Sequence, residues 1–239
     1  MKQIEVKFNF LRLRGMSRTY QALSETKRLH ELSFNDGLEV LLQGEQDERS
    51  NNKRERLLKQ AKFRYQASLE ELIYKPSREL DRGLITSLAT GEYITRGESI
   101  LVSGCAGVGK SFLISALGAN ACSHGYSVAY FNTQKLLMET KTARLDGSVM
   151  KFFQKLAKTS VLIIDDFGLS TFDQQSQFDF MEIIEDRHGK MSTIMASQLP
   201  VENWIDVFSE VTIAEAVMDR LVHTSYRFTL KGNSLRKIR

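Results

Sequence analysis

The sequence has few of the residues that stabilise small secreted or irregular proteins. It contains 2 cysteines and 2 prolines among 239 residues. Cys105 and Cys122 have neither the spacing of a metal-ligand pair nor the density of a disulfide scaffold, which excludes a zinc site and a disulfide-stabilised fold. Reduced thiols are typical of a reducing compartment, so we expect a cytoplasmic protein.

Long apolar runs are also missing. No run approaches the roughly 20 residues of a membrane-spanning helix, and residues 1–10 lack the apolar core of a signal peptide. We therefore expect no membrane partner. Hydrophobic residues make up 42% of the chain, which is enough for a buried core in one large domain or two small ones.

The positive charge is unevenly distributed. The net charge is +4, and 17 basic and 13 acidic residues precede Gly83 against 16 of each from there on. A basic front segment favours an anionic polymer as partner. Between residues 49 and 64, basic residues spaced three and four apart share a helical face, and we take Lys53 and Arg54 as candidate DNA contacts. A solvated helix surface explains the same pattern equally well.

Residues 11–74 have a helical pattern, with many leucines and no proline before Pro76. Ser33 and Asp36 are typical of a capped helix start. Pro76 and Gly83 interrupt the pattern, so we place a boundary near residue 80. The sequence therefore predicts a small, basic, all-helical domain over residues 1–80 and a second domain over residues 81–239.

The second domain alternates buried-strand segments with helical patterns. This order predicts an α/β fold in which helices cover a parallel sheet. Such a sheet binds its ligand beyond the carboxyl ends of its strands. The predicted strands are residues 99–103, 127–132, 160–165 and 193–197.

A complete P-loop, GCAGVGKS, follows the first of these strands and precedes a helical pattern at 112–122. Its glycines let backbone N–H groups turn toward a triphosphate, Lys110 reaches the outer phosphates, and the Ser111 hydroxyl can ligate Mg²⁺. The motif predicts ATP or GTP binding, and a glycine-rich turn without a ligand is the weaker alternative. The candidate nucleotide-binding residues are Gly104, Cys105, Ala106, Gly107, Val108, Gly109, Lys110, Ser111 and Phe112.

The apolar string SVLIIDD (160–166) ends in two adjacent carboxylates, Asp165 and Asp166. In a P-loop enzyme one such carboxylate holds Mg²⁺ through its water shell, and we assign Asp165 this role. Asp166 is then placed to act as the general base for the attacking water. A cap or turn after the strand is the alternative, and it would be favoured if the P-loop were absent.

Two further polar groups are candidates for the same site. The strand at 193–197 ends in Ser197 and Gln198, and either is placed to sense the γ-phosphate, although a simple strand-to-loop cap fits equally well. Arg220, in a later helical pattern, is the candidate arginine finger, which stabilises the transferring phosphoryl group from a neighbouring subunit. An ordinary salt bridge on the helix surface is the alternative for Arg220.

These motifs together resemble the IstB family. The strings LIIDDFGL (162–169), TIMASQLP (193–200), DRLVH (219–223) and LKGNSLR (230–236) carry the likeness, as do LRLRGM (11–16), LSF (32–34) and LLKQAKFRY (57–65) near the front. IstB proteins are AAA+ ATP-binding helpers of an insertion-sequence transposase and stand close to bacterial helicase loaders. The resemblance runs nearly end to end.

The resemblance implies an AAA+ P-loop NTPase that uses ATP and Mg²⁺ and assembles as a homo-oligomer through its ATP interfaces on double-stranded target DNA. It implies that the assembly deforms this DNA and recruits and stimulates the cognate transposase. Carried over, Gly104, Gly109, Lys110 and Ser111 bind nucleotide, Asp165 and Asp166 serve Mg²⁺ and water, Ser197 senses phosphate and Arg220 is the finger.

This sequence departs from the family pattern in several places. Asp166 stands where most AAA+ enzymes have glutamate, so we expect slow hydrolysis that assembly on DNA stimulates. Cys105 stands where proline is expected. Only residues 221–239 follow Arg220, too few for a C-terminal lid, and Arg236 is a candidate for the lid's sensor arginine.

In the relatives, the region between the second strand and the paired aspartates carries DNA-facing helices. Lys135, Lys141, Arg144 and Lys151 are therefore further candidate DNA contacts, with a solvated helix pair as the alternative. The leading hypothesis is an ATPase that helps transposition, and the alternative is a replicative helicase loader. A small-molecule P-loop kinase is disfavoured because no acceptor pocket is recognisable.

Overall fold

The structure, a computed structural model, describes residues 2–235, so the candidate Arg236 lies outside the described residues. The chain forms two compact units that divide between Arg56 and Leu57. No helix in the described part of the chain is long and apolar enough to cross a membrane.

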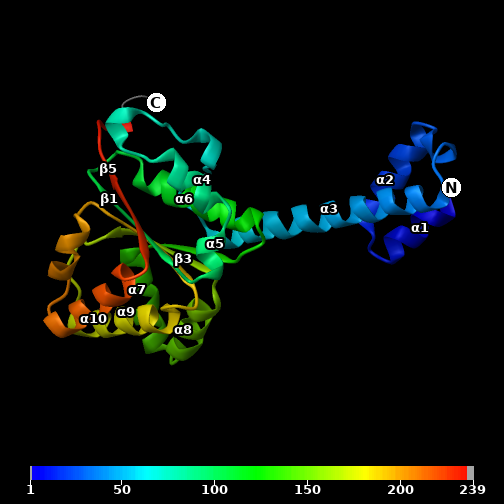
Figure 1. The fold of residues 1–239 in the computed structure, drawn as a ribbon. Coiled ribbons are helices and arrows are strands. Elements are labelled where there is room, and N and C mark those ends of the chain that lie inside the picture. The colour runs from blue at the N-terminus through cyan, green and yellow to red at the C-terminus, as the bar shows by residue number, and fades with distance from the viewer. Residues whose placement is uncertain (1, 236–239) are drawn as a thin grey trace. The chain divides into compact units, whose positions relative to one another are not determined.

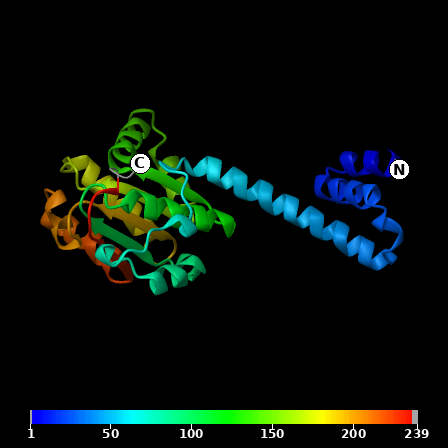
Figure 2. The same cartoon turned by 90° about the horizontal axis from the view of Figure 1, so that it is seen from above.

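The first unit is helical, as the sequence predicts. It consists of α1 (Lys2–Phe10), α2 (Arg14–Glu25), the 3-10 turn η1 (Arg28–His30) and the first part of α3 (Phe34–Ala61). The predicted cap at the start of α3 is present, because the Ser33 hydroxyl donates to Asp36 Oδ2 at 2.6 Å and accepts from the Asp36 N–H at 3.3 Å. From there α3 continues without a break for 28 residues (Figure 2).

Helices α2 and α3 pack closely around a buried carboxylate. A Cβ on Gly15 would lie 2.2 Å from the carbonyl oxygen of Gly44, so only glycine allows this approach. Glu45 Oε2 accepts from the N–H groups of Gly15 at 2.8 Å and Met16 at 3.2 Å, and Arg49 donates to Oε1 at 2.7 Å. Desolvation raises the pKa of Glu45, but the bonds from Arg49 and the two N–H groups outweigh it and hold the pKa below its ordinary value.

The second unit contains a five-stranded parallel sheet with strand order β2-β3-β4-β1-β5. Four strands match the predicted segments, and the fifth was not predicted. That strand lies at the edge of the sheet and alternates buried Phe228 and Leu230 with exposed Arg227 and Thr229, so it lacks a continuous apolar run. The strands are β1 (Ser99–Gly104), β2 (Val128–Asn132), β3 (Val161–Phe167), β4 (Ser192–Ser197) and β5 (Ser225–Leu230).

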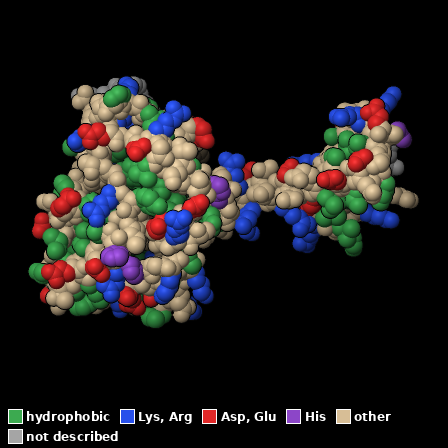
Figure 3. Space-filling model, in the orientation of Figure 1, with side chains coloured by type: hydrophobic (Ala, Val, Ile, Leu, Met, Phe, Trp, Pro, Cys, Tyr) green, Lys and Arg blue, Asp and Glu red, His purple; other side chains and the backbone are tan. Residues whose placement is uncertain are grey.

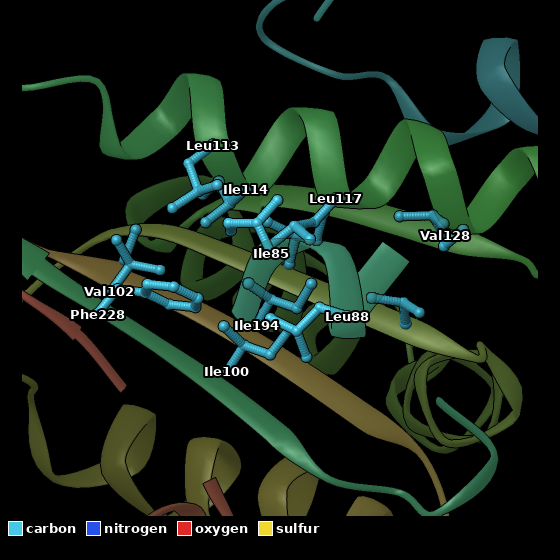
Figure 4. Close-up of a cluster of buried hydrophobic side chains, with 14 of the residues drawn as sticks. Ile85, Leu88, Ile100, Val102, Leu113, Ile114, Leu117, Val128, Ile194 and Phe228 are labelled. Atoms are coloured by element: carbon cyan, nitrogen blue, oxygen red, sulfur yellow. The ribbon is translucent and has the colours of Figure 1, made fainter. Parts of the chain in front are cut away.

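Helices cover both faces of this sheet (Figure 1). Ile100 and Val102 of β1 pack with Leu113 and Leu117 on one face (Figure 4), whereas the intervening Leu101 joins a second cluster on the other face. The first face carries η2 (Leu69–Glu71), η3 (Pro76–Arg78), α4 (Arg82–Ala89), α5 (Glu92–Thr95) and α6 (Lys110–Ser123). The second face carries α7 (Thr133–Leu145), α8 (Val149–Lys158), α9 (Gln174–Arg187), η4 (Val201–Val207) and α10 (Val211–Val222).

Residues 57–80 belong to the second, α/β unit. Leu57, Ala61, Leu72 and Leu80 are buried in the cluster beneath α6, so the compact units divide earlier than the boundary expected near residue 80. The helical pattern that was predicted to continue to Tyr74 ends at Ala61 instead. After β5, the described chain contains only a turn, and no helical lid is present up to residue 235.

Candidate nucleotide-binding site

The P-loop connects the end of β1 to the start of α6 and can be built only with glycine at its key positions. A Cβ on Gly104 would lie 2.3 Å from the carbonyl oxygen of Leu230, and a Cβ on Gly107 would lie 2.2 Å from Ser234 Oγ. Both glycines also have positive φ angles, 144° and 84°. The first N–H groups of α6 have no intrahelical partner, so this end of the helix carries partial positive charge suited to phosphate.

The side chain of Lys110 folds back over the P-loop. It is buried, and Nζ donates to the carbonyl oxygens of Gly104 at 2.6 Å and Cys105 at 2.8 Å. Ser111 and Phe112 follow in the first turn of α6, half-buried, and Cys105 is exposed as a free thiol. The predicted nucleotide-binding residues therefore form one cradle over the amino end of α6.

Asp165 and Asp166 lie just before Phe167, the last residue of β3. They are on the same edge of the sheet as the P-loop because all the strands are parallel, and β4 lies between β3 and β1. The β3–β4 register shifts between Ile164 and Phe167, and Asp166 adopts a left-handed conformation with φ 57°. Such a bulge changes the direction of a side chain at the end of a strand. Asp165 is fully buried, whereas Asp166 is partly exposed.

Both carboxylates have close partners. Tyr130 Oη donates to Asp165 Oδ2 at 2.5 Å, and the Asp166 N–H donates to Asp165 Oδ1 at 2.8 Å. Arg64 Nη1 and Asn132 Nδ2 each donate to Asp166 Oδ2 at 2.9 Å. Burial and the neighbouring Asp165 raise the pKa of Tyr130 well above its ordinary value, so the phenol remains a donor.

The donor set fits a magnesium nucleotide. No group of three or more His, Cys, Asp or Glu side chains in the described part of the chain forms a metal cluster. Mg²⁺ on a nucleotide needs no such cluster, because one or two protein oxygens, the phosphates and water complete its coordination. Ser111 beside the cradle and Asp165 near the end of β3 carry oxygens of the kind that Mg²⁺ binds.

Ser197 lies at the end of β4 but its hydroxyl is engaged within the fold. It is fully buried, donates to the Phe167 carbonyl at 2.7 Å and accepts from the Leu199 N–H at 3.0 Å. The neighbouring Gln198 is exposed and lines a cavity of ≈ 390 Å³ together with Gly104 and Cys105. Of the two polar residues considered from the sequence, Gln198 is therefore the one that shares a surface with the P-loop.

Arg220 lies far from the P-loop of its own chain. It is in the last turn of α10, just before β5, whose first residue Ser225 pairs with Ser99 at the start of β1. The P-loop begins at the other end of β1, and the six residues of that strand span about 20 Å at about 3.3 Å per residue. The Arg220 guanidinium pairs with Glu185 and donates to the Ala216 carbonyl at 2.8 Å.

The candidate DNA contacts differ in their surroundings. Arg144 forms a salt bridge with the nearly buried Asp179, with Nε 2.9 Å from Oδ1, so its charge is neutralised within the fold. Figure 3 shows lysine and arginine side chains exposed along the visible face of α3. The exposed candidates are Lys53 and Arg54 on α3, Lys135 and Lys141 on α7, and Lys151 on α8.

Sequence reasoning missed three residues that contact the acidic pair. Arg64 and Tyr130 approach it only through the tertiary structure, so no local pattern marks them. Asn132 could have been predicted as a site residue, because a polar residue at the carboxyl end of a strand lies at the ligand-binding edge of a parallel sheet.

The family model of the IstB-like ATP binding protein matches residues 6–239. The chain belongs to this family. A protein of Sinorhizobium fredii, named as an insertion sequence ATP-binding protein, is 38% identical over 231 residues, covering 97% of this chain and 94% of its own. A Pseudomonas fluorescens protein named for insertion sequence IS1162 is 43% identical over 191 residues, covering 80% and 83%.

Solved structures show the same AAA+ fold. The crystal structure of the DnaC helicase loader superposes with a TM-score of 0.60 at 22% identity, covering 70% of this chain and 98% of its own. DnaI superposes with a TM-score of 0.59 at 20% identity, covering 74% and 94%. The sequence relatives are thus insertion-sequence ATP-binding proteins, and the helicase loaders share the fold.

Proposed function

We propose that this IstB-family chain is an ATPase that helps an insertion sequence to transpose, by assembling on duplex target DNA in the presence of ATP and acting there with a transposase. The names of its relatives support the insertion-sequence role. The observation that carries the ATPase is the arrangement of the P-loop and of two carboxylates at one edge of the sheet. The third class considered, a small-molecule kinase, has no support in these relatives.

In this proposal, residues 104–112 hold the polyphosphate through backbone N–H groups, and Lys110 contacts the outer phosphates. Ser111 and Asp165 hold Mg²⁺, which when bound neutralises negative charge on the phosphates. Asp166 orients the attacking water and accepts its proton. Because aspartate is shorter than glutamate by one methylene, we expect slow hydrolysis that assembly on DNA stimulates.

Arg220 completes the site of a neighbouring copy. It lies at the opposite end of the sheet from the P-loop of its own chain, so it serves a nucleotide only in trans. A head-to-tail contact of this kind is heterologous and extends into a ring or a filament. ATP bound between copies then favours assembly, because each copy supplies part of the other's site.

Duplex DNA is the proposed anionic partner of the basic side chains. Lys53, Arg54, Lys135, Lys141 and Lys151 are exposed, and within the described part of the chain none of them forms a salt bridge like that of Arg144 with Asp179. Basic side chains that neutralise phosphates release condensed counterions, so binding weakens steeply with salt. We expect the assembled protein to deform its target and to recruit the cognate transposase.

Sizing the protein with a non-hydrolysable ATP analogue, with and without duplex DNA, tests the proposal. We expect a large oligomer only with nucleotide, further stabilised by DNA, and no such oligomer for Lys110→Ala. Duplex binding that is equally tight for the nucleotide-free single copy would refute the proposal.

A replicative helicase loader is the second candidate, because DnaC and DnaI share the fold. The two candidates differ in their protein partner. Binding of the ATP-loaded protein to the transposase of the same insertion sequence, and not to a replicative helicase, supports the first candidate. The opposite result supports the second.

A further inference from the structure

One arginine of the α/β unit is buried directly against the P-loop and pairs with no carboxylate of the described residues. Arg78, at the end of η3, is 5% exposed. Its Nη2 donates to the Val108 carbonyl at 2.8 Å and its Nη1 donates to the Ile73 carbonyl at 2.7 Å. Among the described residues it forms no ion pair, and its Nε–H is buried without a hydrogen-bond partner.

The guanidinium lies at the last two residues before α6. A Cβ on Gly109 would be 2.8 Å from Arg78 Nη2, so glycine at that position makes room for the arginine. On the other side, the Lys231 N–H donates to the Arg78 carbonyl at 3.2 Å, which fixes η3 to the end of β5. Arg78 is therefore held in place from both sides.

This position is electrostatically unfavourable in the protein alone. The Arg78 guanidinium has lost its hydration and has only two neutral carbonyl oxygens in its place, and burial lowers the pKa of Arg78. The amino end of α6 also carries partial positive charge, which repels a guanidinium. A negative charge at the P-loop would relieve both effects.

Another buried arginine shows that burial alone does not imply a ligand. Arg187 is 1% exposed and also forms no ion pair with any carboxylate that the structure describes, but all three of its nitrogens donate hydrogen bonds within the fold. Arg78 differs in having one donor without a partner and in contacting the P-loop. All the nitrogens of Arg187 are used within the fold, as expected of a structural residue. Arg78 instead leaves one nitrogen without an acceptor beside a ligand-binding loop.

We propose that Arg78 is a positioning residue of the polyphosphate site. Its bond to the Val108 carbonyl holds that oxygen away from the ligand, so that the neighbouring N–H groups face the phosphates. Its charge adds to that of Lys110 in attracting a nucleoside di- or triphosphate. The inference rests on the proposed ATP site and adds a residue that neither the P-loop motif nor the acidic pair includes.

Two substitutions separate the charge of Arg78 from its packing. Arg78→Met removes the charge and keeps much of the length, and Arg78→Lys keeps the charge. We expect Arg78→Met to raise the Kd for ATP and ADP about tenfold, because a charge-assisted contribution is lost. We expect Arg78→Lys to restore part of that affinity.

Stabilisation by nucleotide gives a second readout. A merely structural arginine would lower the unfolding temperature equally with and without ATP, whereas replacing a residue of the polyphosphate site also reduces the rise in unfolding temperature that ATP causes. Arg82→Met is the matched control, since Arg82 is exposed in the same segment and stacks on Tyr74 with its guanidinium carbon 5.5 Å from the ring centroid. We expect wild-type nucleotide affinity for this control.

The inference is overturned if Arg78→Met binds ATP like the wild type, or if Arg78→Lys shares its full loss. Should Arg78→Met not fold, Arg78→Gln gives the same comparison with a neutral side chain. A wild-type protein that binds no ATP refutes the proposed function. Loss of binding in Lys110→Ala, with wild-type binding in Arg78→Met, refutes only the role of Arg78.

Discussion

At the scale of single residues, the carboxylates of Asp165 and Asp166 have the most hydrogen-bond and ion-pair partners in the site. Asp166 accepts hydrogen bonds from Arg64 and Asn132, and Arg64 Nη1 lies 3.6 Å from the buried Asp165. A carboxylate oxygen that accepts a charge-assisted hydrogen bond from a guanidinium is less available to water or to Mg²⁺ than a free one. In this arrangement Arg64 therefore opposes the role assigned to Asp166.

Removing Arg64 should increase hydrolysis in the absence of DNA. We expect Arg64→Ala to raise the rate of phosphate release severalfold at saturating ATP and Mg²⁺, because the Asp166 carboxylate becomes available to water. Lys59→Ala is the control, since Lys59 is an exposed residue at the end of α3. A lower rate in Arg64→Ala than in the control would show that Arg64 assists the reaction.

Ser197 and Gln198 should respond differently to alanine. Ser197→Ala leaves the Leu199 N–H and the Phe167 carbonyl without their buried partner, which we expect to lower the free energy of unfolding by about 1–3 kcal/mol. Gln198→Ala should change stability by less than about 0.5 kcal/mol and reduce hydrolysis. Chemical unfolding and steady-state hydrolysis measure both effects, and full activity in Gln198→Ala would exclude it as the phosphate sensor.

At the scale of elements, apolar runs made four of the five strands predictable, including the edge strand β2. The edge strand β5 lacks such a run because Arg227 and Thr229 are exposed. The end of α3 at Ala61 was also unpredictable, since no proline or glycine marks it. The P-loop and the acidic pair are contiguous in sequence and were found, whereas Arg64 and Arg78 reach the site only through tertiary packing.

The contact between α2 and α3 should depend on pH. Because the pKa of Glu45 is lower in the folded state, its stabilising effect is complete above the pKa of the unfolded chain and is lost as the pH falls through the folded value. We expect Glu45→Gln to exchange the amide hydrogens of α2 faster at neutral pH and to lose less protection on acidification than the wild type. Glu39→Gln, at an exposed position of α3, is the control, and equal pH profiles in both variants would contradict the role of Glu45.

At the scale of the whole molecule, Arg220 decides whether the ATP site is complete in one chain. Its partner Glu185 is partly exposed, and exposed ion pairs contribute only about 0–1 kcal/mol, so the pair is no barrier to a role in a neighbouring copy. We expect Arg220→Ala to bind ATP but to lose DNA-stimulated hydrolysis, while Lys110→Ala binds no ATP. The two variants are therefore defective in different parts of one shared site.

Mixing the two inactive variants tests whether the site is shared. In a mixed assembly, a Lys110→Ala copy still carries Arg220 and can supply it to the ATP of an Arg220→Ala neighbour. We expect equimolar mixing on duplex DNA to recover part of the wild-type hydrolysis, rising with protein concentration because the active site forms only on association. A mixture as inactive as its components, or normal hydrolysis by Arg220→Ala alone, would show that each chain works without its neighbour's arginine.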